Sequence, residues 1–423
     1  MKRKHNTIIF LIFLMLQCGI VQSQQTLTLE QIKSKALENN KRLKRAQSSV
    51  NAAKAASAAA NAADKPTVDA SVFGMYLSDP FKTLLPEYSA NGSVAVTQVV
   101  YAGSKIQTAK KMTGAAVELQ NAQKELTEDE VLLSAESTYW QIINLKEKQT
   151  LAENYLKLLK ELKKDLQNSF DAGLIYKNDL LKVEVQENEA VLNLTKAKDG
   201  LALAKLSLGQ ITGLNGDQWD LADNSSADVA LISQADTQAA VNNRPEIGTL
   251  QKAVEINQYQ GRLLEGDRKP TVALSANGLA SYGKKINFSD GSDDMQAFVG
   301  LVTVSVPILD WGGRKQKVKE QHFETEARKL ELEETKELLG IEIQNAWLML
   351  NQSITQIELT KKSMKQAEEN LRLNQDRFDA GTVLGEDVLE AQVLWRKAYS
   401  DLIDAKAGYK INEAKYKKAI GEY

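Results

Sequence analysis

The sequence contains almost no cysteine and almost no histidine. Cys18 is the single cysteine in 423 residues, and His5 and His322 are the two histidines. A zinc cluster needs several such ligands, and a histidine-based triad needs a histidine beside its nucleophile and its acid. A disulfide framework needs paired cysteines. We therefore expect no catalytic site, no metal and no cofactor, and we predict that the protein is not an enzyme.

The chain also lacks an excess of charge of either sign. It carries 53 Lys and Arg against 55 Asp and Glu, for a formal net charge of −2. Binding of nucleic acid usually needs a clustered basic face. A glycine-rich phosphate loop is missing too, because Gly312-Gly313 lacks the Walker pattern. We therefore expect no nucleic-acid partner.

Proline is scarce and unevenly placed. The chain has six prolines, of which none lies between Gly103 and Arg244 and none follows Pro307. Because proline interrupts the interior of a helix, these two stretches are free to form very long helices.

The first apolar run is too short to cross a membrane as a helix. Residues 8–16 are unbroken and apolar, whereas a spanning helix needs about 20 residues. Lys2, Arg3 and Lys4 precede this run, and Val21-Gln22-Ser23 offers small residues for cleavage. Residues 1–23 are therefore predicted to be a secretory signal peptide.

Two interpretations of Cys18 stay open. It is either lipidated after export or discarded with the signal peptide. Leu16-Gln17 before it is a poor match to the small residues of a lipoprotein site. If Cys18 is discarded, the mature chain has no cysteine.

One pattern occurs twice along the chain. Lys65-Pro66-Thr67-Val68 returns as Lys269-Pro270-Thr271-Val272, and Phe170-Asp171-Ala172-Gly173 returns as Phe378-Asp379-Ala380-Gly381. Val100-Tyr101-Ala102-Gly103-Ser104-Lys105 is echoed by Asp310-Trp311-Gly312-Gly313-Arg314-Lys315. Because the offsets are nearly equal, we predict a tandem duplication. Residues 24–213 form the first repeat, 214–236 a turn-rich linker and 237–423 the second repeat.

Each repeat is expected to contain a very long helical hairpin. A helical segment (29–63; 237–264) comes first, and the long helices run over about 102–167 and 312–377, each about 100 Å in length at 1.5 Å per residue. A glycine turn and a return helix follow. Apolar residues recur every seven positions, which is typical of a coiled-coil seam. In the second long helix these are Ile343, Leu350, Ile357, Met364, Leu371 and Phe378.

Four stretches alternate with a period of two and are predicted to be strands: 72–76, 94–100, 274–282 and 298–306. In the last, Phe298, Val302 and Val304 share one face, while Thr303 and Ser305 lie on the other. One lipid-compatible face suits a transmembrane barrel. Four strands cannot close a barrel, and an open sheet edge is not viable in lipid, so strands in a membrane would require several chains.

An exported, duplicated chain with these strand pairs and helical hairpins resembles the TolC family of outer-membrane channels. The resemblance covers nearly all of the mature chain and is strongest in the prolyl strand starts, the Tyr-Ala-Gly and Trp-Gly-Gly helix starts and the Phe-Asp-Ala-Gly turns. It implies a mainly α fold with a small β part. The long helical hairpins would form an α-barrel tunnel, and four strands per chain would contribute to a trimeric twelve-stranded transmembrane β-barrel.

The resemblance also implies a location and partners. The chain would be a homotrimer in the outer membrane of a Gram-negative bacterium, in contact with its lipid and with a large periplasmic part. Substrates would arrive from an inner-membrane transporter through a periplasmic adaptor protein. The function would be that of a channel-tunnel in tripartite efflux or type I secretion.

The resemblance further suggests a periplasmic constriction and a docking site. Asp387 and Glu390, one helical turn apart, match an acidic ring of the family, and Phe378 and Asp179 would complete the constriction. Capping of the helix N-terminus by Asp387 is an equally open interpretation. The adaptor would dock at the hairpin tips, although simple helix reversal also explains these residues. The tip residues are Ala172, Gly173, Leu174, Ala380, Gly381 and Thr382.

A structural periplasmic coiled-coil protein, such as an adaptor or a scaffold, is the alternative function. Adaptors have one hairpin flanked by β-domains. The duplication, with its two strand pairs, argues against this alternative.

Overall fold

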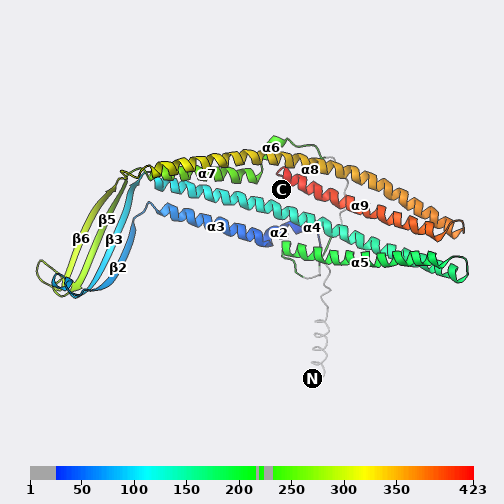
Figure 1. Cartoon of the computed structure of the whole chain (residues 1–423), viewed down its shortest axis with the longest axis horizontal. Helices are drawn as coiled ribbons and strands as arrows, with labels where there is room; N and C mark the ends of the chain where they lie inside the picture. Colours follow the sequence, from blue (N-terminus) through cyan, green and yellow to red (C-terminus); the bar gives the residue numbers. More distant parts are fainter. Residues whose placement is uncertain (1–24, 216–218, 223–231) are drawn as a thin grey trace, which may run out of the picture. The chain divides into compact units, whose positions relative to one another are not determined.

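The computed structural model describes residues 25–215, 219–222 and 232–423. The predicted signal peptide, with Cys18, lies outside the described residues, as do parts of the predicted linker. The helices are α2 (Leu29–Asn39), α3 (Lys41–Ala62), α4 (Lys105–Asp171), α5 (Lys177–Thr212), α6 (Thr237–Asn242), α7 (Pro245–Gly266), α8 (Gly313–Asp379) and α9 (Gly385–Ala419) (Figure 1). The strands are β1 (Gln25–Leu27), β2 (Thr67–Tyr76), β3 (Tyr88–Ala102), β4 (Trp219–Leu221), β5 (Thr271–Gly283) and β6 (Asp294–Ser305). A short 3-10 turn, Phe81–Thr83, lies between β2 and β3.

The mainly α fold with a small β part is confirmed. Helices α4 and α8 each contain 67 residues, as the absence of proline and the seven-residue seam predicted. The seam of α8 begins with Ile343 and Leu350, which are buried, and its later members are half-buried. Within the described ranges, none of the helices combines the length and the apolar character needed to cross a membrane.

The chain divides into two compact units, and each unit draws on both halves of the sequence. The first takes its described residues from Met1–Leu43, Glu128–Asp236 and Glu342–Tyr423, and the second is built from Lys44–Thr127 and Thr237–Ile341. The divisions fall inside α3, α4 and α8. The predicted repeats are therefore not separate bodies, and their boundaries stay a prediction.

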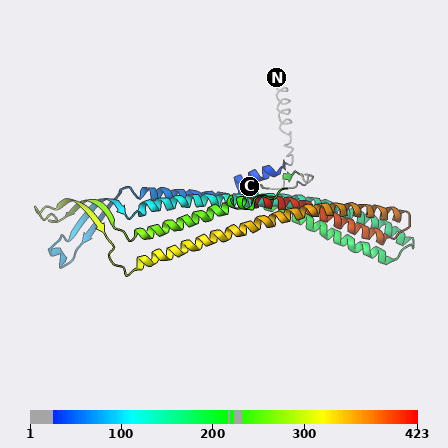
Figure 2. The same cartoon turned by 90° about the horizontal axis from the view of Figure 1, so that it is seen from above.

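The second unit contains one antiparallel sheet with the strand order β2-β3-β5-β6. The four strands lie side by side (Figure 2). They are longer than the period-two stretches indicated, because hydrogen-bonded pairing continues through residues without strict alternation. Thr67 pairs with Thr97 at one end of β2, and Tyr76 pairs with Tyr88 at the other.

The core of the first unit brings α2, α4 and α5 together with the linker. Tyr139 and Ile142 of α4 are fully buried among residues of α2 and α5. Trp219 and Leu221 of β4 join this core, and β4 pairs in parallel with β1. This part of the linker is therefore a packed element, which its weak sequence pattern did not indicate.

The predicted helix 29–63 is interrupted at Asn40, so the single-helix expectation was wrong. Asn40 has an extended backbone, and its Oδ1 accepts a hydrogen bond from the Arg42 amide at 2.9 Å. Its Nδ2 donates to the Ile211 carbonyl, also at 2.9 Å. Asn40 therefore caps the start of α3 and also satisfies a carbonyl at the end of α5. These two roles favour a break over a continuous helix. The predicted helix 237–264 is likewise divided, because Pro245 starts α7 afresh.

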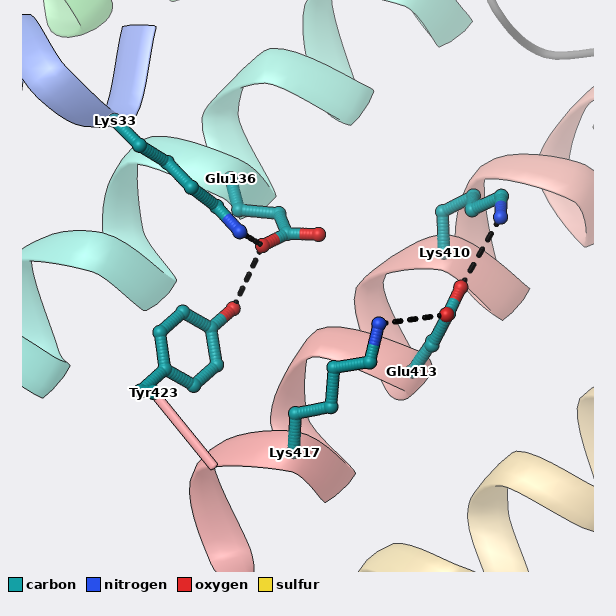
Figure 3. Close-up of polar contacts among 6 residues, drawn as sticks. All are labelled: Lys33, Glu136, Lys410, Glu413, Lys417 and Tyr423. Carbon is teal, nitrogen blue, oxygen red and sulfur yellow. Dashed lines mark hydrogen bonds and ion pairs between the residues drawn. The ribbon is translucent and has the colours of Figure 1, made fainter. Parts of the chain in front are cut away.

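A polar cluster in the first unit joins α2, α4 and the last residue, Tyr423, by hydrogen bonds and an ion pair (Figure 3). The buried Glu136 carboxylate of α4 accepts from Lys33 Nζ of α2 at 2.6 Å and from the Tyr423 hydroxyl at 2.8 Å. Burial, with the Glu136 charge beside it, holds the pKa of the Tyr423 phenol above its usual range, so the phenol stays protonated and donates. Lys33 also lies over the Tyr423 ring at 5.2 Å.

Removing the carboxylate of Glu136 should loosen this cluster, because Lys33 and Tyr423 would lose their common acceptor. We expect Glu136→Ala to lower the free energy of opening of α2 by about 2 kcal/mol. Amide hydrogen exchange of α2 measures this opening. Glu125→Ala, an exposed site in the same helix, is the control. Equal exchange rates in both variants would contradict the assigned role of Glu136.

Candidate functional site

Both long helices end in the same hydrogen-bonded turn. At the end of α4, the Gly173 amide donates to the Phe170 carbonyl and the Leu174 amide donates to the Ser169 carbonyl, each at 2.9 Å. Gly173 has φ +75°, a backbone conformation that side chains with a Cβ disfavour. This pair of bonds is the Schellman motif, which stops a helix and reverses the chain.

The second turn repeats this geometry. Gly381 has φ +71° and donates to the Phe378 carbonyl, while Thr382 donates to the Arg377 carbonyl, each at 2.9 Å. The predicted helix reversals are therefore present. The docking role assigned to the tip residues Ala172, Gly173, Leu174, Ala380, Gly381 and Thr382 stays a prediction. All six are exposed.

Two further tip residues escaped the sequence analysis. Tyr176 is 85% exposed and Leu384 is 68% exposed, and both immediately precede a return helix, α5 or α9. They occupy matching places in the two repeats. With Leu174, at 77% exposure, they give the tips an apolar surface that solvent alone does not favour. The signal was available, since an apolar residue stands at the N-cap in both repeats.

The structure assigns a structural role to Asp387. Its Oδ2 accepts a hydrogen bond from the Leu384 amide at 2.9 Å, which satisfies a free amide at the start of α9. The capping interpretation of Asp387 is therefore confirmed. Its carboxylate remains exposed, so the ring interpretation stays open beside the cap.

An ion pair that the sequence analysis missed lies next to this cap. Lys182 of α5 donates to Glu386 of α9 at 2.7 Å, and this hydrogen bond holds the pKa of Lys182 above its ordinary value. The pair joins the two helical hairpins of the first unit. Residues separated by about 200 positions cannot be paired from sequence spacing alone.

Glu390 lines a groove between α5 and α9. The groove has a volume of about 430 Å³ and is also lined by Lys182, Val185 and Glu386. The structure thus brings Glu390 close to the Lys182–Glu386 pair. The Glu390 carboxylate has no hydrogen bond or ion pair within the described part of the chain.

Phe378 and Asp179 lie in the same region but in different surroundings. Phe378 is half-buried against an apolar cluster that includes Leu166, Val388 and Leu389. Asp179 stands in the first turn of α5, half-buried, where a carboxylate is favoured by the helix dipole. Phe378 is therefore held by packing. Its part in a constriction, like that of Asp179, stays a prediction.

The sheet has one apolar face and one face that carries most of its polar side chains. Because partners across strands share a face, the register places Phe298, Val302 and Val304 with Val272 and Leu274 on one side. We call this side the apolar face. It continues through Val68, Val72, Val94 and Val96, with Tyr76, Tyr88 and Tyr282 at the loop end.

The opposite side, here called the polar face, carries most of the hydroxyl and amide groups. They include Thr67, Ser71, Asn91, Ser93, Thr97, Thr271, Ser275, Asn277, Thr303 and Ser305. The predicted division of the last strand, with Phe298 on one face and Thr303 on the other, is confirmed by this register. An apolar band ending in tyrosines is typical of the lipid-facing side of an outer-membrane barrel.

Comparisons with known proteins agree with this architecture. The family described as outer membrane efflux protein matches residues 32–214 and 237–422. The chain is 23% identical over 378 residues to the outer membrane efflux protein BepC of Brucella suis biovar 1 (strain 1330), covering 88% of this chain and 77% of the relative. It is 22% identical over 352 residues to the outer membrane protein TolC of Escherichia coli (strain K12), covering 79% and 69%.

A solved structure shares the fold. The Campylobacter jejuni CmeC outer membrane channel superposes with a TM-score of 0.79 at 18% identity, covering 93% of this chain and 85% of that chain. These matches confirm the resemblance drawn from the sequence. They support the channel and give no support to the alternative of an adaptor or scaffold.

The tip geometry predicts opposite effects of the same substitution at two glycines of one hairpin. Gly381→Ala should destabilise the turn by about 1 kcal/mol, because a Cβ at positive φ is strained. Gly408→Ala, inside α9 with open space around it, should stabilise the helix by about 0.5–1 kcal/mol. Thermal unfolding followed by circular dichroism measures both. A higher melting temperature for Gly381→Ala would contradict the Schellman assignment.

Proposed function

We propose that this chain, which belongs to the outer membrane efflux protein family, assembles as a homotrimer around one continuous channel. The protein is an outer-membrane efflux channel, and its family is one of transport proteins rather than enzymes. The main observation in favour of the trimer is a four-stranded sheet that has an apolar face and two outer strands, each paired on one side only within the described residues.

The outer strands β2 and β6 favour assembly of several copies into one barrel. Each pairs on one side only within the described residues. In lipid the free backbone groups of an open edge would cost several kcal/mol each, so the edges must meet strands of other copies. Because all neighbouring strands are antiparallel, β6 of one copy can continue into β2 of the next.

The number of strands favours three copies over two. About eight strands leave an interior that side chains fill, whereas a larger barrel encloses a channel. Twelve strands, four from each of three chains, leave room for a solute. The apolar face would then contact lipid, and the polar face would line the lumen.

Exposed apolar residues of the helices also fit contacts between copies. In the first unit they include Leu203 and Leu206 of α5, with exposures of 67% and 70%, and Leu348 and Leu359 of α8, with exposures of 58% and 57%. Apolar side chains on a long helix are usually covered by a neighbouring helix. Three copies side by side would cover them and form the periplasmic tunnel.

The helix tips are the proposed docking site for the partners. Leu174, Tyr176 and Leu384 present exposed apolar side chains beside the glycine turns. A periplasmic adaptor with an amphipathic helical hairpin could bury these residues in a helix-to-helix contact. The adaptor would connect the channel to an inner-membrane transporter in a tripartite efflux or type I secretion system.

The constriction is proposed near the N-terminus of α9. Glu390, with no ion pair of its own within the described residues, and Asp387, exposed beside it, would place six carboxylates around the axis of a trimer. Rings of carboxylates favour cations. Asp179 lies at the matching place in α5, and the packing of Phe378 would set the width of the passage.

Single-channel recording of the purified trimer in planar bilayers tests this proposal. We expect a small, cation-selective conductance in the wild type. Asp387→Asn/Glu390→Gln should lose cation selectivity, because the charges that attract cations are gone, and should conduct more. Glu368→Gln, an exposed carboxylate of α8 away from the tip, is the control and should leave selectivity unchanged.

Two results would contradict the proposal at different points. Failure to form trimers or to conduct in bilayers would overturn the channel assembly. A conducting trimer whose selectivity is the same in the double variant and the wild type would overturn the constriction alone.

A further inference from the structure

A basic pocket lies where the strands of the second unit meet its helices. It has a volume of about 360 Å³ and is bordered by the end of α7, the starts of α4 and α8, the start of β5 and the end of β6. Its charged lining consists of four cations, Lys105, Lys269, Arg314 and Lys317, and one carboxylate, Asp267. The sequence analysis did not single out these residues as a site.

Two glycines bring the lysines of this basic pocket together. A Cβ on Gly103 would lie 2.7 Å from the Gly266 carbonyl oxygen and 2.8 Å from Cβ of Lys269. A Cβ on Gly266 would lie 2.5 Å from Cγ of Lys105. The start of α4 therefore approaches the end of α7 more closely than any side chain would allow. This contact sets Lys105 and Lys269 on the same pocket wall.

The charges of the basic pocket are not balanced. Lys105 Nζ is 2.9 Å from Asp267, and Arg314 Nε is 3.8 Å from Asp310. Lys269 and Lys317 have no carboxylate partner within the part of the chain that the structure describes. Like charges gathered around a pocket repel one another, and an anion between them relieves the repulsion.

The helix dipoles add to this positive potential. Helices α4 and α8 both begin at the pocket, and neither has an acidic residue in its first turn. Lys105 and Arg314 of the pocket lie in these first turns instead, which the positive end of a helix disfavours. Asp310 shows that this end attracts anions, since its carboxylate accepts from the backbone amides of Gly312 at 3.1 Å and Arg314 at 2.8 Å.

The sheet register shows on which side the basic pocket opens. Thr271 and Ser305 line the pocket, and they are register partners on the polar face. Their hydroxyl groups can donate to an oxyanion. The apolar face, which would contact lipid, contributes none of the strand residues to the lining.

We propose that the basic pocket binds the phosphate or carboxylate group of a solute in the lumen, at the junction of the barrel with the helices. The proposal rests on the proposed function, because it needs the polar face to line the lumen. Lys269 and Lys317 supply the free charges, and Lys105 and Arg314 complete the cationic wall. Three copies would form a basic collar that holds the anionic group of a solute after it has left the periplasmic tunnel.

Titration of the purified trimer with inorganic phosphate tests the site directly. We expect Lys269→Gln/Lys317→Gln to weaken phosphate binding at least about tenfold, or about 1.4 kcal/mol. Lys65→Gln/Lys315→Gln removes the same charge and is the matched control. Lys65 is the counterpart of Lys269 in the first repeat, and Lys315 adjoins Arg314, but neither lines the pocket. Lys269→Arg/Lys317→Arg should retain binding.

Equal phosphate affinity in the wild type and in Lys269→Gln/Lys317→Gln, or no binding to the wild type, would overturn the site. Single-channel current recordings then test whether the site lies in the lumen. Phosphate should reduce the wild-type current, and this reduction should disappear in Lys269→Gln/Lys317→Gln but not in the control. A current unaffected by bound phosphate would overturn the luminal position.

A lipid headgroup is the other source of the same phosphate chemistry. Stabilisation of the wild type by phosphatidylglycerol but not by inorganic phosphate, lost in Lys269→Gln/Lys317→Gln, would overturn the luminal solute as the ligand. The failure of the proposed function looks different. In that case no pore conducts, while phosphate still distinguishes the wild type from the variant.

Discussion

A helix of 67 residues depends on neighbours that cover its apolar stripe along its whole length, because propensity and internal hydrogen bonds alone leave helices in water marginal. The seven-residue seam supplies that cover. It favours antiparallel return helices, and these require a tight reversal at each tip. The shorter helices are interrupted locally, at Asn40 and at Pro245. Much of the remaining structure follows from this requirement for lateral packing.

The sheet needs a different kind of partner from the long helices, because the backbone groups at its outer edges must be paired. Its strands pair with one another from β2 to β6, but among the described residues of a single chain nothing pairs with its two outer edges or covers its apolar face. An isolated sheet of this kind would be a site of aggregation. In the proposed trimer, closure with other copies would satisfy the edges, and lipid would cover the apolar face. Assembly and membrane insertion therefore solve the same physical problem.

The charged groups have two kinds of role in this architecture. Some join segments, as Lys182 does with Glu386 and Glu136 does with Lys33 and Tyr423. Others have no ion-pair partner among the residues that the structure describes, with Glu390 near the helix tips and Lys269 and Lys317 where strands meet helices. Uncompensated charges contribute little to folding. In the proposed channel, the acidic groups and the basic groups would present different electrostatic environments to a solute.

The sequence by itself determined the long helices, the duplicated order, the glycine turns and the alternation of the strands. These features depend on residues close together in the chain, such as Phe378 to Gly381, or on a regular period. The sequence also offered capping by Asp387 as one of two open interpretations, since a cap is local. Only the tertiary structure decided the Lys182–Glu386 pair, the burial of Trp219 and the basic pocket, because their members come from distant segments. Contacts of this kind are set by packing, and no local pattern encodes them.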